Sequence, residues 1–220
     1  MREKPILFST PMVQALLDDT KNQTRRTNGL EFINENPDRW LSASIVSGED
    51  DKILAAFRGK VNPLIVASAV ECPFGKEGDR LWVRETWQNG GWDGTTTVSP
   101  AYKAAGHAHL CGGWRPSIHM PREISRVLLE ITDVRIDRLQ NISAADAIGE
   151  GIKAHESWPE APDVPRYQLY GPLYEKSADK LGYETISDPV FSFFTLWISI
   201  HGDDAVKKNP WVWVVNFKRL

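Results

Sequence analysis

Cysteine is scarce in this chain of 220 residues, and long apolar segments are missing. Cys72 and Cys111 are too few for a disulfide framework, and both fit a reduced cytoplasm. No apolar run approaches the roughly 20 residues that a membrane-spanning helix needs, which excludes a membrane protein of that kind. The stretch before Pro11 has only a short apolar run and no small-residue cleavage site, so we expect no signal peptide and a cytoplasmic location.

The common catalytic and phosphate-binding motifs are also absent. The chain has no GxGxxG after a predicted strand, no GxxxxGKS/T, no HExxH and no GxSxG. His107, His109 and His119 could be grouped on paper with the two cysteines, but their spacings match no zinc pattern. We therefore expect neither a metal nor a cofactor.

Charge of either sign is not in excess, because 26 lysines and arginines stand against 29 aspartates and glutamates, a net charge of −3. A protein that coats duplex DNA regardless of sequence is not expected, although a local basic cleft is compatible with this balance. What the chain does have is nine tryptophans. Aromatic side chains fill cores first and stack on nucleic-acid bases second.

Apolar and β-branched runs bounded by turn residues predict strands. Four strands of one barrel or strongly curved sheet are expected, at residues 64–70, 80–87, 126–136 and 211–218. Helical spacing predicts short helices at residues 12–19, 144–149 and 190–200. Pro11 marks the first turn of the first helix, and Ser143 and Asp146 suit the first turn of the second. The residues of the last helix that we expect to face the core are Phe191, Phe194, Trp197 and Ile198.

Two weakly patterned segments interrupt these elements. Residues 28–62 are interpreted as an insertion that carries a helix or two and is not part of the core, and residues 153–187 as a second insertion. Residues 88–113 are rich in Gly, Thr and Ser and predict a long loop or a hairpin excursion. Strands of mixed spacing with few helices favour an α+β fold. We expect one domain over residues 1–220, a small β-barrel with flanking helices and the two insertions.

The segment Lys21-x-x-Thr24-x-Arg26 is the most informative stretch. A lysine three residues before a threonine, in a tight turn, can bring an ammonium group and a hydroxyl together. In a partly dry cleft the pKa of such a lysine falls, and the neutral amine can take the threonine proton. The alternative is an ordinary solvated basic turn.

Carboxylates at two other places in the sequence also have either a functional or a purely structural interpretation. Glu150 closes the predicted short helix before a glycine, so it either points into a cleft or lies at the surface as a helix-end residue. Asp79 enters the predicted strand 80–87 and most simply stabilises the preceding turn, whereas Glu85 alternates with apolar residues of that strand.

The order of these segments resembles the ASCH domain family, in the PUA-like β-barrel group, in the elaborated form carried by prophages. The resemblance covers roughly half of the chain and skips both insertions. The stretches that carry it are the Lys21–Arg26 segment, residues 72–87, residues 114–122, Leu129–Val134, Glu150-Gly151-Ile152 and residues 209–214.

This resemblance implies a PUA-like fold and a cytoplasmic role, in a bacterial host cell, with RNA or a modified nucleoside. One bacterial ASCH branch removes the acetyl group from N4-acetylcytidine with a lysine, a threonine and a glutamate. By the motif these roles fall on Lys21 as base, Thr24 as nucleophile and Glu150, which would orient the lysine or help protonate the leaving amine. No metal is required for this chemistry.

A second hypothesis is binding without catalysis, in a basic cleft beside the barrel. In this hypothesis Trp87 or Trp114 is a stacking platform for a base. The remaining residues expected to bind nucleic acid or substrate are Lys21, Arg25, Arg26, Arg84, Glu85, Arg115, His119 and Arg122. A third hypothesis is a phage–host protein interaction made by the two insertions. No membrane partner is expected.

Overall fold

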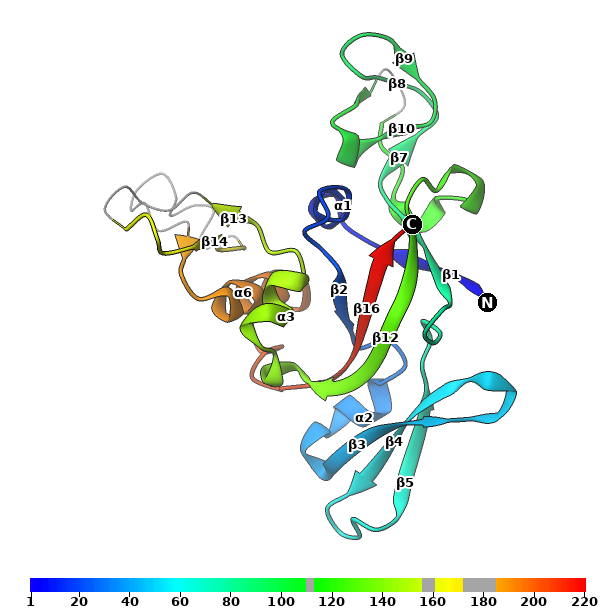
Figure 1. The fold of residues 1–220 in the computed structure, drawn as a ribbon, viewed down its shortest axis with the longest axis vertical. Coiled ribbons are helices and arrows are strands. Elements are labelled where there is room, and N and C mark those ends of the chain that lie inside the picture. Colours follow the sequence, from blue (N-terminus) through cyan, green and yellow to red (C-terminus); the bar gives the residue numbers. More distant parts are fainter. Residues whose placement is uncertain (110–112, 156–160, 172–184) are drawn as a thin grey trace. The chain divides into compact units, whose positions relative to one another are not determined.

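A computed structural model describes residues 1–109, 113–155, 161–171 and 185–220 (Figure 1). It is a mixed α+β structure with several sheets, which confirms the expected class. The chain divides into two compact units. Unit 1 comprises residues 1–22, 74–133 and 216–220, and unit 2 comprises residues 23–73 and 134–215. Each unit combines segments that are distant in sequence, and the expectation of one domain stays a prediction.

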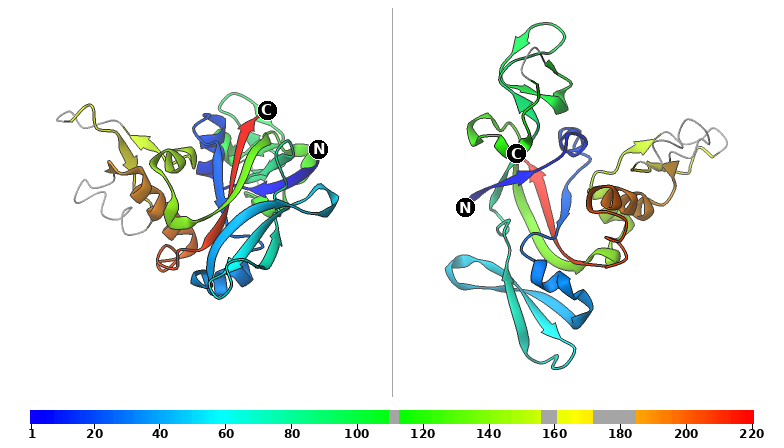
Figure 2. Two further views of the ribbon diagram at one scale, coloured as in Figure 1. Left: turned by 60° about the horizontal axis from the view of Figure 1, so that its bottom comes forward. Right: turned by 180° about the vertical axis from the view of Figure 1, so that it is seen from behind.

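The largest sheet has five strands in the order β1-β6-β12-β16-β2. Strand β1 runs parallel to β6, and β12 runs antiparallel to β6. The long strands β12 and β16 each carry residues of both units (Figure 2). The bounds are β1 Glu3–Leu7, β2 Gln23–Arg26, β6 Arg80–Arg84, β12 Leu128–Arg138 and β16 Trp211–Arg219.

Unit 1 contains helix α1 (Thr10–Leu17), which begins with Pro11 in its first turn, as the sequence predicts. The segment 88–113 forms short antiparallel hairpins wherever it is described, so a hairpin excursion is confirmed there. Asp79 accepts hydrogen bonds from the backbone N–H groups of Arg2 and Lys76, in agreement with the expected turn role. The hairpin strands are β7 Trp87–Gln88, β8 Gly91–Trp92, β9 Thr97–Val98, β10 Ala101–Tyr102 and β11 Ala108–His109.

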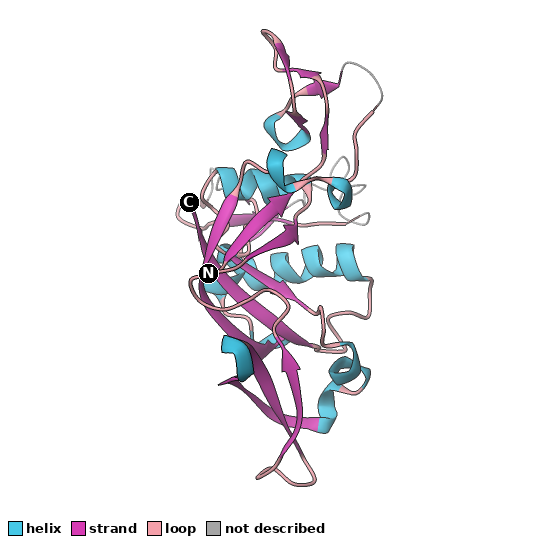
Figure 3. Ribbon diagram, turned by 90° about the vertical axis from the view of Figure 1, so that its right-hand side faces the viewer, coloured by secondary structure: helices cyan, strands magenta, loops and turns pink. Residues whose placement is uncertain are grey.

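The expectation that residues 28–62 lie outside the core is wrong. They form helix α2 (Glu31–Glu35) and two strands of a three-stranded sheet, β3 (Trp40–Ser47) and β4 (Ile53–Gly59), which is completed by β5 (Val66–Glu71) (Figure 3). Phe57 is fully buried, and its ring packs edge-on against Trp40 and Trp211 with centroid distances of 5.7 and 5.4 Å. Small alanine and serine side chains interrupt the large apolar residues of these strands, so the sequence shows no clear alternation of apolar and polar residues.

The rest of unit 2 packs helices α3 (Ala144–Gly149) and α6 (Pro189–His201) over one hydrophobic core. Ser143 and Asp146 form a capping box at the start of α3, and this helix start was expected. The predicted buried face of α6 is partly wrong, because Phe193 and Trp197 are buried whereas Phe191 is 42% exposed. The side chains of Ser192 and Thr195, which hydrogen-bond backbone carbonyls, take the remaining buried positions.

Only part of the predicted insertion 153–187 lies within the described residues. Its described strands are β13 (Ala154–His155), β14 (Arg166–Gln168) and β15 (Thr185–Ile186), which form a small antiparallel sheet. Tyr167 of β14 belongs to the core of unit 2, so this part of the segment is not merely external. Residues 156–160 and 172–184 lie outside the described part of the chain.

All four predicted strand regions contain strands, but their grouping in one sheet is wrong. Strand β5 pairs with β4 in the three-stranded sheet, and Trp87 belongs to β7 rather than to β6. The described strands form no closed barrel. Among the described helices, none is long and apolar enough to cross a membrane.

Candidate functional site

The Lys21–Arg26 segment is not a solvated turn. Gln23, Thr24 and Arg25 lie on strand β2 and are 5%, 2% and 4% exposed. Lys21 is 3% exposed. Burial of this many polar side chains requires partners, because an isolated buried charge costs several kcal/mol.

Arg25 has its partners in unit 2. Its guanidinium Nη2 lies 3.0 Å from Asp146 Oδ2, and its Nη1 lies 3.3 Å from Glu150 Oε1. Arg25 Nη1 also donates to the side-chain oxygen of Gln23. Gln23 and Arg135 each donate to Asp146 Oδ1 at 2.9 Å. We call these five residues the Asp146 cluster; it connects β2 and β12 to helix α3.

The Asp146 cluster changes the acidity of its central carboxyl group. Burial acts to raise the pKa of Asp146, but hydrogen bonds from Gln23 and Arg135 and the charges of Arg25 and Arg135 outweigh it. The pKa of Asp146 is therefore held well below its ordinary value of 3.8. Asp146 stays ionised wherever the protein is folded at ordinary pH, and the cluster is a permanent charged network.

Glu150 is buried, at 5% exposure, so its interpretation as a surface residue at a helix end is wrong. It is the C-terminal cap of α3, and Gly151 follows with a φ of 80°, a left-handed conformation that turns the chain away from the helix. This turn leaves the Glu150 carboxylate beside Arg25. Its pairing with Arg25 explains the burial of Glu150 without any catalytic role.

Lys21 belongs to unit 1, where its Nζ lies 5.5 Å from the centre of the Phe8 ring. Thr24 and Glu150 belong to unit 2. The meeting of Lys21, Thr24 and Glu150 in one cleft therefore stays a prediction.

Arg26, the last residue of β2, is half-buried. Burial lowers the pKa of Arg26 and the Glu150 carboxylate opposes this effect. The pKa of His201, at the end of α6, lies below its ordinary value of 6.5. Partial burial of the His201 ring is the larger cause, and the positive charge of Arg26 is the smaller one. Arg26 thus lies close enough to α6 to influence its C-terminal end.

Four of the predicted nucleic-acid residues of unit 1, Arg84, Arg115, His119 and Arg122, lie in one region, at the ends of β6 and β7. Arg84 and Arg122 both lie over the Trp82 ring, with guanidinium-to-centroid distances of 4.6 and 6.0 Å. Arg115 lies over the Trp87 ring at 5.1 Å. Exposed His119 is in the turn that follows Arg115, and Arg84 donates to the carbonyl of Ile118 in the same turn. We call Trp82, Arg84, Trp87, Arg115, His119 and Arg122 the arginine–tryptophan face.

The tryptophans of this face are not open stacking platforms. Trp82 is 8% and Trp87 6% exposed, and each carries at least one guanidinium group. A base could stack directly on Trp87 only after Arg115 moves. The groups that the face presents to a partner are the planar guanidinium groups, which can pair with phosphates and stack on bases.

Glu85 is not part of that presented surface. It is 1% exposed and accepts two hydrogen bonds from Arg126, at 2.9 and 3.0 Å. Arg126 in turn lies 4.2 Å from the centre of the Tyr102 ring. Glu85 therefore holds Arg126 in place, and the sequence did not indicate this pairing.

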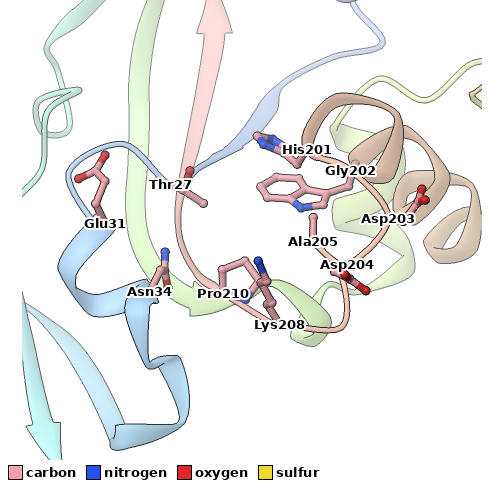
Figure 4. Close-up of a pocket in the computed structure, with 11 residues that line it drawn as sticks. Thr27, Glu31, Asn34, His201, Gly202, Asp203, Asp204, Ala205, Lys208 and Pro210 are labelled. Atoms are coloured by element: carbon pink, nitrogen blue, oxygen red, sulfur yellow. The ribbon is translucent and has the colours of Figure 1, made fainter.

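Unit 2 contains an open pocket of about 500 Å³ (Figure 4). Its walls come from the chain after β2, from α2, and from the C-terminal end of α6 with the loop that leads to β16. One wall of the pocket begins at Thr27, directly after the Lys21–Arg26 motif, and this motif is the one sequence signal that points to the pocket. The lining residues between 201 and 210 belong to no recognisable sequence motif. The residues that line it are Thr27, Glu31, Asn34, Trp197, His201, Gly202, Asp203, Asp204, Ala205, Lys208 and Pro210.

No group of three or more His, Cys, Asp and Glu residues in the described part of the chain is arranged to hold a metal ion. Cys111 and the side chain of His109, considered above for zinc, lie outside the described residues. The expectation of no metal and no cofactor stays a prediction.

Comparison with protein-family models, with curated proteins and with solved structures gave no match for this chain. Its function has to be inferred from the residues of the two units.

Proposed function

We propose that the protein binds single-stranded RNA, and that the arginine–tryptophan face of unit 1 makes the contact. The observation that carries the proposal is the set of three arginines, Arg84, Arg115 and Arg122, held over tryptophan rings in one region. A guanidinium group held in this way loses less side-chain freedom when it binds than a free arginine does.

The distribution of charge supports the same unit. Unit 1 holds 12 lysines and arginines against 10 aspartates and glutamates, a net charge of +2. Unit 2 holds 14 against 19, a net charge of −5. Phosphate groups are therefore attracted to unit 1 and repelled from unit 2. The chain as a whole is acidic, and this asymmetry is what allows it to bind a polyanion.

The resemblance to ASCH domains implies a partner of the same class, RNA or a modified nucleoside. We also propose that the chain is a member of this family, that its sheet is part of a PUA-like barrel and that the protein is cytoplasmic. The binding residues that we retain from the sequence are Arg84, Arg115, His119 and Arg122. Arg122 also pairs with Glu3 at 2.9 Å, but this ion pair is solvent-exposed and a phosphate group can replace it. Arg25 is already engaged by Asp146 and Glu150 in unit 2.

Alanine substitution of Arg84, Arg115 or Arg122 is expected to weaken binding of a fluorescently labelled polyuridine oligonucleotide about tenfold each, because a charge-assisted contact is worth about 1.5–3 kcal/mol. Fluorescence anisotropy at several salt concentrations checks this. Each lost phosphate contact is expected to reduce the slope of log K against log salt concentration by about 0.7.

The matched control is Arg39→Ala. Arg39 is exposed and also lies over a tryptophan, 5.4 Å from the centre of the Trp40 ring, but it belongs to unit 2. The Arg39→Ala variant is expected to bind RNA with an affinity within about twofold of the unsubstituted protein, because removing one exposed charge outside the binding face has a small effect. Equal weakening by Arg39→Ala, or no binding by the unsubstituted protein, would contradict the proposal.

A second candidate function is hydrolysis of an N4-acylated cytidine. The observation that favours it is the burial of Lys21 and Thr24, which are 3% and 2% exposed. A lysine in a dry setting can be neutral enough to accept the Thr24 proton as the hydroxyl attacks the acyl carbon.

For this candidate Thr24→Ala is expected to abolish release of cytidine from N4-acetylcytidine, because the attacking oxygen is lost. Thr24→Ser, which keeps a hydroxyl at the same position, is expected to retain turnover. Mass spectrometry of a panel of N4-acylated cytidines measures both. Turnover by Thr24→Ala equal to that of the unsubstituted protein would exclude Thr24 as the nucleophile.

A further inference from the structure

The pocket of unit 2 differs in charge from the face proposed for RNA. Glu31, Asp203 and Asp204 line it, against the single cation of Lys208. Glu31 lies on one side of the pocket and the two aspartates lie on the other (Figure 4). The C-terminal end of α6, beside His201, adds partial negative charge from its backbone carbonyls. A phosphate-bearing ligand is disfavoured here.

One wall of the pocket is aromatic. Trp197 and His201, one turn apart on α6, have ring centroids 4.2 Å apart and planes inclined by 32°. The lowered pKa of His201 keeps its ring neutral at neutral pH, so His201 does not repel a cation. The rings of Trp197 and His201 attract cations through their π electrons and pack against alkyl chains, while the charge of Arg26, which also acts on His201, opposes the attraction of cations.

The indole N–H of Trp197, in the same wall, lacks a hydrogen-bond acceptor among the described residues. Trp197 is 5% exposed and lines the pocket. Buried polar groups without partners are uncommon in folded proteins, and each of them calls for an explanation such as water, an ion or another bound molecule.

The opposite wall is already formed. The Asn34 side chain donates to the Trp211 carbonyl at 2.9 Å and accepts from the Trp211 N–H at 2.8 Å, which fixes α2 to β16. Asn34 is therefore structural. Asp204 pairs with Lys207 at 3.4 Å, so the charges left for a ligand are mainly those of Glu31 and Asp203. In the described chain no three metal-ligating side chains converge, so the carboxylates fit a cation of several atoms better than a metal ion.

We propose that this pocket binds a small aliphatic amine, with ammonium groups at Glu31 and at Asp203 or Asp204 and its alkyl chain against Trp197 and His201. The volume of about 500 Å³ is within the range of small-molecule sites. Three carboxylates stand against Lys208 in the lining and against Lys207, which pairs with Asp204, so one net negative charge remains for an ammonium group.

The test uses a matched series with one carbon chain: putrescine, N-acetylputrescine and N,N′-diacetylputrescine. Isothermal titration calorimetry of the full chain is expected to detect the first two and not the third, which has no charge. Glu31→Gln with Asp203→Asn is expected to weaken putrescine binding about tenfold, since each rim carboxylate contributes about 1 kcal/mol at most.

The control pair is Glu49→Gln with Asp50→Asn, which removes the same charge from an exposed acidic turn of unit 2 outside the pocket. It is expected to leave putrescine affinity within twofold, roughly a surface effect. Equal weakening by the two pairs would show nonspecific attraction and overturn the proposal. Failure of both amines to bind, equal binding of the diacetyl compound, or tighter binding of a lysine-containing peptide than of putrescine would overturn it too.

Discussion

Replacing Asp146 with alanine is expected to lower the free energy of unfolding by about 3 kcal/mol, as breaking a buried ion pair does. The Arg25 side chain is 1% exposed and would keep only one of its two carboxylate partners. Gln23 and Arg135 would each lose a hydrogen bond at 2.9 Å. The capping box of α3 would be lost as well. Urea denaturation followed by circular dichroism measures the change.

The control is Asp163→Ala, an exposed aspartate of the same unit, for which a change within about 0.5 kcal/mol is expected. The pH dependence adds a second check. Because folding lowers the pKa of Asp146, the stability that it provides is present above its ordinary value of 3.8 and is lost as pH falls below it. The stability difference between the unsubstituted protein and Asp146→Asn should therefore shrink below that pH. A difference independent of pH would contradict the charged network.

Phe57→Ala is expected to cost about 4 kcal/mol, the usual loss when a fully buried phenylalanine is removed. Its ring contacts both Trp40 of β3 and Trp211 of β16. The truncation would leave a cavity between these two large rings, which cannot collapse easily. Tryptophan fluorescence during denaturation measures the loss and reports on the packing of the same rings.

Phe32→Ala is the control within the same segment, because Phe32 is 61% exposed although its ring contacts Trp40 edge-on. A cost of at most about 1 kcal/mol is expected for it. If residues 28–62 were an external insertion, both variants would have small and similar effects. A small effect of Phe57→Ala would thus restore the interpretation that the structure contradicts.

Local signals in the sequence were sufficient to place several elements. Ser143 and Asp146 start α3, Pro11 lies in the first turn of α1, and the β-branched residues of 126–136 form most of β12. These features depend on neighbours within one turn or one strand. The periodicity of residues 190–200 also predicted α6, but not which face is buried, because Phe191 and Phe193 are equally apolar and only the core beneath them selects Phe193.

The candidate sites were only partly predictable, for a physical reason that the buried polar residues illustrate. The sequence singled out Thr24, Arg25 and Glu150, but a charged residue in a polar stretch looks solvated until its partner is known. Arg25 can be buried because Asp146 and Glu150, more than 120 positions away in sequence, compensate its charge.

The sequence by itself determined the class, the capped helices and the arginines of unit 1. The tertiary structure alone decided that Arg84, Arg115 and Arg122 cover the tryptophans and that acidic residues surround the pocket. Those arrangements depend on contacts between distant segments, whose energies no local pattern records.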